Sequence, residues 1–401
     1  MVTASLLLTT YTSGRISKIP LNIDTTLVYS GTATKALDPA SLSEEKFVIS
    51  ENVPVVKQQQ ISVEAPANAE VVTLQVGDTL RWSQKQKDSG VLLAIVDTVT
   101  MNRHTAEAVS SDANPGGSVQ RPRTIEDKNP PTNVPLPHHG LTYRFPFNTE
   151  KKTYSMFDPV AQKAYDADFQ GTEDIEGLTA YKFTQNVGFD ASGKLVEPVK
   201  YPSLYEKGED SRVTAHAGQW GIADADEWDE VTMDRYYAAQ RTFWVDPASG
   251  IILKQTEKGS DYYARDALRP EVWYAEYSVT STPETVEAQV AAANSERNSL
   301  SLWDRILPIT LGALGLVSLV GGGVLGWFGL RAHSLESAAS AATRSGGSGA
   351  VISAVTGSMA KVSATPVVRR VLSRRPRRVD TGPMPAAEAA TEKLPSRPPT
   401  D

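Results

Sequence analysis

The stretch AYKFTQNV, residues 180–187, decides the class of the fold. With a side-chain period of two, Tyr181, Phe183 and Gln185 face one way and the residues that follow each of them face the other. Alternation of this kind is typical of a β-strand with one face in a core and one face in water. The stretch therefore predicts a half-buried strand.

Eight further runs share this composition, rich in Val, Ile, Thr and aromatic residues and separated by Gly, Pro, Asn and Asp. Stretches long enough for parallel β-α-β units are missing, which favours an antiparallel sheet. We therefore expect a mainly β domain. The runs are residues 25–31, 59–65, 71–76, 91–100, 141–147, 242–245, 251–258 and 273–280.

Two segments, residues 154–169 and 242–257, predict hairpins of the same design. Each has an aromatic strand end, then Asp-Pro, a short turn and a second strand. Common turn chemistry and an internal duplication both explain the likeness, since Pro after Asp presets a turn. The Pro- and Gly-rich stretches 103–140 and 188–225 predict long surface loops.

Residues 306–330 read ILPITLGALGLVSLVGGGVLGWFGL, with no charged side chain over 25 residues. At about 1.5 Å per residue this helix measures roughly 37 Å, enough to cross a bilayer core of about 30 Å with some tilt. A buried core helix is the alternative, but soluble cores rarely need so long an uncharged run. We therefore expect one transmembrane helix.

Charge is divided unevenly along the chain. Of the 40 Lys and Arg and the 47 Asp and Glu residues, 28 and 41 lie in residues 1–300, giving −13 there and +6 in residues 301–401. Arg331, Arg344 and the run RRVLSRRPRR (369–378) follow the span, and positive charge beside a span stays in the cytoplasm. We therefore expect residues 1–300 outside the cytoplasm.

Small residues recur at helical spacing along the predicted span. Such residues let two helices approach closely in lipid, although Gly is also common in spans that pack against nothing. We predict a helix-packing face, and with it a homo-oligomer. The face consists of Gly315, Ser318, Gly322, Gly326 and Gly329.

The chain divides into five predicted parts. VTASLLL (residues 2–8) is too short to span a membrane and looks like the end of an apolar segment. Thr282, Pro283 and Glu284 suit the start of a helix that leads to the span. The parts are a remnant of an N-terminal apolar segment (1–14), an extracytoplasmic antiparallel β domain (15–281), a helical stalk (282–305), the transmembrane helix (306–330) and a disordered basic tail (331–401).

No enzymatic motif is present in the sequence. Without Cys there is no disulfide and no thiol chemistry. His138 and His139 are adjacent, an arrangement in which the two rings cannot easily share a metal. We therefore expect no enzyme, no catalytic residue, no cofactor and no metal site. The basic tail should contact anionic lipid rather than nucleic acid.

An acidic run, ADADEWDE (223–230), is similar to a calcium loop. Asp229 stands where an EF-hand requires Gly, and Arg235 stands where it requires Glu, so that assignment fails. We expect a solvated loop that attracts cations weakly. Its acidic residues are Asp224, Asp226, Glu227, Asp229 and Glu230.

Several dispersed segments together resemble the PorA-type porin family of corynebacteria and related mycolate-bearing actinobacteria. The resemblance covers about residues 10–331. It implies a cell-wall channel for small hydrophilic solutes or ions, and the acidic domain would favour cations. The segments are TYTSGRISKIPLNIDTTLVYSG (10–31), HHGLTYRFPFNTEKKTYSMFDPVAQKAYDADFQG (138–171), EDIEGLTAYKFTQNV (173–187) and TFWVDPASGIILKQ (242–255).

Two hypotheses follow. In the first, the chain is a cation-preferring porin in the outer, mycolate-containing layer of the cell envelope. The strands, however, do not show the repeated ten-residue apolar-out pattern of a membrane barrel, so such a channel would need several chains. In the second, the span anchors the chain in the plasma membrane, and the outer β domain binds lipid or supports envelope assembly.

Overall fold

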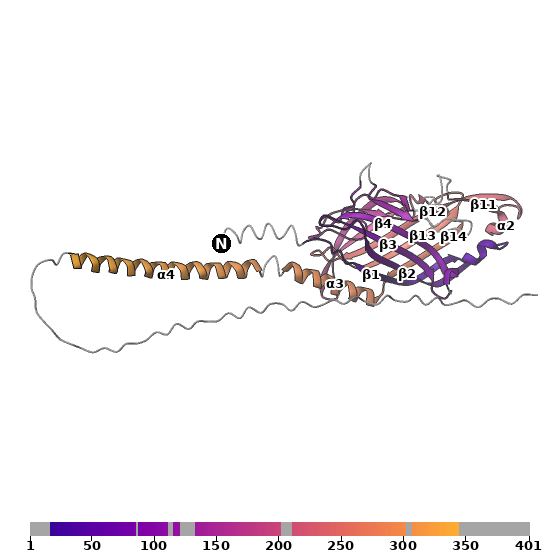
Figure 1. Ribbon diagram of the computed structural model, residues 1–401. Helices are drawn as coiled ribbons and strands as arrows, with labels where there is room; N and C mark the ends of the chain where they lie inside the picture. Colours follow the sequence, from indigo (N-terminus) through magenta and orange to yellow (C-terminus); the bar gives the residue numbers. More distant parts are fainter. Residues whose placement is uncertain are drawn as a thin grey trace, which may run out of the picture. The chain divides into compact units, whose positions relative to one another are not determined.

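The computed structural model describes residues 17–85, 87–110, 115–120, 133–201, 211–301 and 307–344 (Figure 1). Within these residues the protein is mainly β, as predicted, with one antiparallel sheet of 14 strands. The strands are β1 (Asp24–Leu37), β2 (Ile49–Glu64), β3 (Val71–Trp82), β4 (Val91–Asn102), β5 (Gly117–Gln120), β6 (Asn133–Pro135), β7 (Tyr154–Asp158), β8 (Lys163–Ile175), β9 (Leu178–Val187), β10 (Val199–Lys200), β11 (Arg212–His216), β12 (Glu230–Val245), β13 (Ile252–Ala264) and β14 (Val272–Ser281).

Helical elements are few within the described residues. Two are short 3-10 turns, and one is a single turn beside β11. The two long helices follow the last strand. The elements are η1 (Pro39–Ser43), η2 (Lys87–Gly90), α2 (Ala217–Trp220), α3 (Pro283–Ser301) and α4 (Leu307–Arg344).

The sheet is built largely from neighbouring strands of the chain. Its order is β6-β5-β4-β3-β2-β1-β14-β13-β12-β9-β8-β7, with β10 and β11 both paired to β12. The β1–β14 pair joins the first strand to the last, with Tyr29 opposite Ser281. The two predicted hairpins are confirmed as β7–β8 and β12–β13.

The sheet curls until its two sides are bridged by short segments. Ala108 forms an isolated bridge with Met101 of β4, and its N–H donates to Gly140 O at 2.9 Å. Leu141 in turn bridges Met156 of β7. The result is a barrel-like layer around one main hydrophobic cluster that includes Phe145.

Eight of the nine predicted strand runs overlap observed strands, but LTYRFPF (141–147) does not form one. Its backbone bonds to a turn instead, because Phe145 N–H donates to Gly250 O at 3.0 Å. The Phe145 ring is fully buried and lies 4.7 Å from the ring of Phe183. The run is apolar because it packs into the core as irregular chain.

The helix predicted after residue 282 is confirmed as α3. Thr282 Oγ1 accepts from Thr285 N–H at 3.3 Å, which caps the first turn. Val286, Val290 and Ala293 form the predicted apolar face, and they are buried against a cluster that includes Leu253. The first turns of α3 therefore pack on the sheet, and a stalk role for the remainder stays a prediction.

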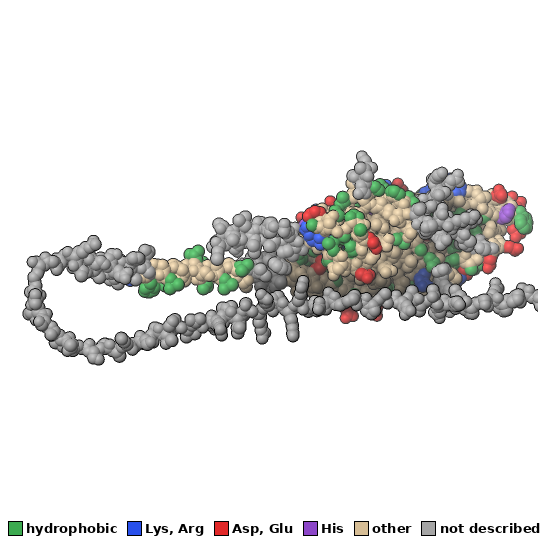
Figure 2. All heavy atoms as spheres, in the orientation of Figure 1, with side chains coloured by type: hydrophobic (Ala, Val, Ile, Leu, Met, Phe, Trp, Pro, Cys, Tyr) green, Lys and Arg blue, Asp and Glu red, His purple; other side chains and the backbone are tan. Residues whose placement is uncertain are grey.

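The helix α4 contains one segment, Ile309–Phe328, that is long and apolar enough to cross a membrane, and almost none of it is buried. Hydrophobic side chains lie along it (Figure 2). The helix continues to Arg344, beyond the predicted end of the span at residue 330. The predicted N-terminal remnant and the tail after residue 344 lie outside the described residues.

Candidate functional site

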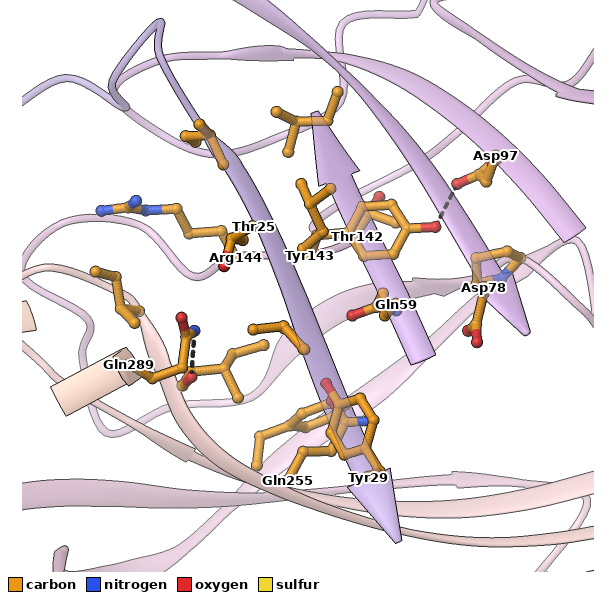
Figure 3. A pocket seen from close by; sticks show the side chains of 18 of the residues that line it. Thr25, Tyr29, Gln59, Asp78, Asp97, Thr142, Tyr143, Arg144, Gln255 and Gln289 are labelled. Atoms are coloured by element: carbon orange, nitrogen blue, oxygen red, sulfur yellow. Dashed lines mark hydrogen bonds between the residues drawn. The ribbon is translucent and has the colours of Figure 1, made fainter. Parts of the chain in front are cut away.

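A cavity of about 350 Å³ lies inside the curled sheet (Figure 3). Its wall is formed by strands β1 to β4, β7, β9, β12 and β13, by the chain around Tyr143, and by one face of α3. Among the lining residues, those exposed to solvent are Asn22, Asp24, Ala288 and Ala292. The mouth of the cavity therefore lies between the start of β1 and α3.

Much of the cavity wall is apolar. The alternation of the strands turns aliphatic and aromatic side chains inward, as for the strand 180–187, where Phe183 is fully buried. Ligand sites in proteins are commonly concave and mostly apolar, with a few placed polar groups. The apolar lining includes Leu27, Ile61, Leu74, Ile95, Met156, Phe157 and Phe243.

A network of buried charges borders the cavity, centred on Glu257. The Glu257 carboxylate accepts from Lys57 Nζ at 2.8 Å, from Arg241 Nε at 2.8 Å and from Tyr277 Oη at 2.6 Å. Lys57 also pairs with Asp78 at 3.2 Å. Every carboxylate in this group thus lies beside a cation, as buried charges require.

Electrostatics in the network follow from burial and pairing. Burial opposes ionisation of Glu257, but the charges of Arg241 and Lys57 outweigh it and hold the pKa of Glu257 well below its usual value. For Asp78 burial prevails over the attraction of Lys57, and the pKa of Asp78 is raised. The pKa values of the two carboxylates are therefore shifted in opposite directions.

The two Asp-Pro turns supply further buried carboxylates. Asp158 Oδ1 accepts from Ala161 N–H at 2.7 Å, and the other oxygen of Asp158 pairs with Arg241. Asp246 makes the same kind of turn bond with Ser249 N–H at 2.9 Å and also pairs with Arg297 of α3 at 2.6 Å. A sequence signal for turns thus also marks two anchoring points for arginine side chains.

A second polar group connects β4 to the loop before β7. Asp97 Oδ2 accepts from Tyr143 Oη at 2.7 Å (Figure 3) and also lies 3.1 Å from Nε2 of His138. The other ring nitrogen of His138 lies 3.0 Å from Leu136 O, and its ring is 4.0 Å from the Phe157 ring. His138 is therefore a buried structural residue that helps close the sheet.

Several buried polar atoms around the cavity have no hydrogen-bond partner within the described part of the chain. Four of the six such atoms belong to lining residues: Asp78 Oδ1, Asp97 Oδ1, Thr142 Oγ1 and Arg144 Nε. Asp97 is only 1% exposed and Thr142 only 4%. Unsatisfied buried groups are rare in folded proteins, so this concentration indicates a site for water or a ligand's polar group.

The predicted acidic loop follows α2 and ends at Glu230, the first residue of β12, and all five of its carboxylates are exposed. Asp224 pairs with Arg265 at 2.7 Å, and Asp229 accepts from Asp226 N–H at 3.2 Å. Figure 2 shows red acidic side chains gathered at this end of the domain. Their attraction for cations stays a prediction.

The predicted packing face, with Gly315, Ser318, Gly322, Gly326 and Gly329, lies on α4. Within the described part of the chain, apart from the adjoining backbone of α4 itself, no heavy atom lies within 4 Å of where a Cβ would sit on Gly322 or Gly326. A partner helix on this face is therefore sterically allowed, and its presence stays a prediction.

Sequence reasoning missed the cavity and its charged network. A signal was available, because Gln185 stands on the predicted apolar face of its strand beside Phe183. Arg241 and Phe243 repeat the pattern on β12, where both side chains line the cavity. A polar residue at an inward position of an alternating strand marks a buried polar site.

Comparison with known proteins supplies the family. The sequence model described as Porin PorA matches residues 1–324. The chain is similar to Porin PorA of Corynebacterium amycolatum, with 28% identity over 372 residues that cover 80% of this chain and 94% of the relative. It is also similar to Porin PorA of Corynebacterium resistens (strain DSM 45100 / JCM 12819 / GTC 2026 / SICGH 158), with 27% identity over 387 residues covering 81% and 93%.

The family match tests two of the predictions made from the sequence. The resemblance is confirmed over nearly the same residues, and membership among porins confirms that the chain is not an enzyme. The chain belongs to the porin PorA family.

Proposed function

We propose that the protein forms a channel in the cell envelope for ions or small hydrophilic solutes. The observation that carries this proposal is the family match over residues 1–324. Both relatives, each covered over more than nine-tenths of its length, are described as porins. The function is thus that of a membrane channel.

The route across the membrane is proposed to involve α4 rather than the strands. Among the large hydrophobic residues that are exposed, Val134 alone lies on a described strand, whereas eleven lie on α4. A strand barrel in lipid would need an apolar outer band. Several copies of α4, associated through the small-residue face, could surround a pore, which makes the proposed channel a homo-oligomer in contact with membrane lipid.

Cation preference is the finer part of the proposal. The charge of −13 in residues 1–300 supports it, since a vestibule lined by carboxylates concentrates cations. The acidic loop would contribute at the end of the domain that carries α2. The basic tail supports an orientation with the β domain outside the cytoplasm. The proposed place in the mycolate-containing layer is supported by the family resemblance alone.

Conductance of the purified full-length chain in planar bilayers tests the channel. We expect discrete current steps in potassium chloride, and a reversal potential under a salt gradient that reports cation selectivity. Purified protein that binds to the bilayer and gives no steps would exclude the channel.

A matched pair of variants tests the acidic loop. Neutralising Asp226, Glu227, Asp229 and Glu230 as Asn or Gln should shift the reversal potential toward zero. The control neutralises four exposed acidic residues elsewhere, Glu51, Glu64, Asp166 and Glu284. Equal shifts in both variants would mean that net charge, and not this loop, sets the preference.

A second candidate function is favoured by the cavity. The chain would then be an inner-membrane-anchored envelope protein whose β domain binds lipid or supports envelope assembly. A concave, largely apolar cavity is the usual form of a small-molecule site. Fractionation separates the two candidates, because an outer-layer location supports the channel and a plasma-membrane location supports the binding role.

A further inference from the structure

The residues that line the cavity determine which kind of ligand can bind there. Most of the cavity's exposed wall is apolar, and the buried polar atoms without a hydrogen-bond partner among the described lining residues belong to Asp78, Asp97, Thr142 and Arg144. An apolar body in contact with the lining would be driven in by burial of its surface. The polar groups would then decide which head the ligand carries.

The charge of the lining disfavours an anionic head. Five carboxylates line the cavity, against three cations. Each cation is already paired: Lys57 and Arg241 with Glu257, and Arg144 with Glu296 at 3.2 Å. A carboxylate or phosphate would have to displace one of these partners. An uncharged head avoids this competition, and it also avoids the cost of burying a new charge.

Three of the four unpartnered atoms can accept a hydrogen bond, and the fourth, Arg144 Nε, can only donate one, so the ligand's head must both donate and accept. Asp78 Oδ1 and Asp97 Oδ1 can only accept while ionised, and Thr142 Oγ1 can either donate or accept. Figure 3 labels these three residues among the side chains that line the cavity. A hydroxyl group satisfies an acceptor carboxylate without bringing charge into the cavity.

We propose that the cavity binds one uncharged, hydroxyl-bearing amphiphile, whose apolar chain lies against the aliphatic wall and whose head group supplies hydroxyls to Thr142 and to Asp97. The ligand enters between the start of β1 and α3, where the lining is exposed. The inference rests on the binding role and is independent of conductance. It would hold for a channel that carries a bound lipid as well as for an anchored binding protein.

Binding is tested with three probes that share a twelve-carbon chain. Native mass spectrometry of the detergent-solubilised full-length protein would measure adducts with glycerol monolaurate, dodecylamine and laurate. We expect a one-to-one adduct with glycerol monolaurate, at least tenfold higher in occupancy than with laurate. Equal or greater occupancy by laurate or by dodecylamine would overturn the assignment of an uncharged head.

Two neighbouring alanines of α3 provide the variant and its control. Ala292 lines the mouth, whereas Ala291 is also exposed but does not line the cavity. Ala292→Trp should reduce glycerol monolaurate occupancy at least tenfold, and Ala291→Trp should leave it unchanged. Equal loss in both variants, or no loss in either, would overturn the proposed entrance and site.

The head-group contact has its own variant. Thr142→Val keeps the shape of the side chain and removes a hydroxyl that has no partner within the described residues. We expect three- to tenfold weaker binding with an unchanged melting temperature, and unchanged binding would overturn the contact. Conductance of the same variants separates the proposals, because lost binding with intact current steps leaves the channel standing.

Discussion

The surface of the sheet and the surface of α4 have opposite compositions. The sheet turns its apolar side chains into its own interior, so that Phe183 and Leu253 are fully buried. The helix has no interior, and Val317 and Leu325 are 70% and 74% exposed. The sheet thus buries its apolar side chains without a partner. The apolar surface of α4, by contrast, requires a cover of lipid or of other helices.

Charged side chains placed on α4 should have the largest effect, because they remove the apolar surface that distinguishes this helix from the sheet. Each Arg at the centre of a transmembrane helix costs about 2.5–3.5 kcal/mol on insertion scales. We expect Leu316→Arg with Val320→Arg to abolish membrane retention, measured by carbonate extraction and flotation. The same two charges on exposed strand positions, Thr172→Arg with Thr179→Arg, should leave retention unchanged. Retention of the α4 variant would mean that α4 is not the membrane anchor.

Removing one member of the buried network should have the next largest effect. Arg241→Met leaves Glu257 and Asp158 without their shared partner, and breaking a buried pair in this way costs about 3–5 kcal/mol of unfolding free energy. Urea unfolding of the full-length protein in detergent at pH 7 measures this loss of unfolding free energy. The exposed pair of Arg212 with Asp234 is the control, since Arg212→Met should cost at most about 1 kcal/mol.

The pH dependence of that effect has a definite sign. Because pairing holds the pKa of Glu257 below its unfolded value, the pairing stabilises the fold above the unfolded pKa. This stability is lost as pH falls toward the lower, folded pKa. The difference in unfolding free energy between the wild type and Arg241→Met should therefore be largest near pH 7 and should become smaller below about pH 4.5. A gap that widens in acid would contradict the assigned role of Glu257.

The small-residue face of α4 allows a test of whether other helices, and not lipid alone, cover this helix. If other helices cover this face, Gly322→Leu should weaken self-association by about 1–2 kcal/mol, a range that includes a tenfold change. Gly323→Leu changes the neighbouring side of the helix and should have little effect. Cross-linking in vesicles over a range of protein densities measures both. Equal effects would mean that no specific face exists.

The smallest expected effect concerns α3, the helix that precedes α4 in the chain. Thr282→Ala removes the cap of its first turn and should cost about 1 kcal/mol of unfolding free energy. Thr285 on the same turn bonds the backbone of Val28 at 3.0 Å and 3.1 Å, so its replacement by Ala should cost more. The order of the two losses in thermal unfolding reports whether the helix is held by its cap or by β1.

Much of the architecture could be predicted because it follows local rules. The alternation in residues 180–187, the Asp-Pro turns and the uncharged run at 306–330 each determine one element without reference to distant chain. The segment 141–147 has the composition of a strand, but its backbone partner, Gly250, lies about a hundred residues away. A local sequence pattern cannot identify a hydrogen-bond partner that lies so far away in the chain.

The cavity could not be predicted for the same reason. Lys57 and Glu257 meet across 200 residues of sequence, and only the pairing order of the sheet brings them together. In the sequence, Lys57 and Glu257 each look like an ordinary charged side chain on a strand. The inward position of Gln185 was a usable signal, but a single polar residue does not reveal how many others converge on it.

The pairing of β1 with β14 has a consequence for how the molecule is made. Contacts between residues so far apart in sequence raise the contact order, and loop-closure entropy slows folding accordingly. During synthesis β1 must wait, with an unpaired edge, until β14 has emerged. Both α3 and α4 follow β14 in the chain, so the last gap in the sheet can close before the apolar segment of α4 is complete. With α4 as the proposed anchor, each chain would complete its domain shortly before it is attached to the membrane.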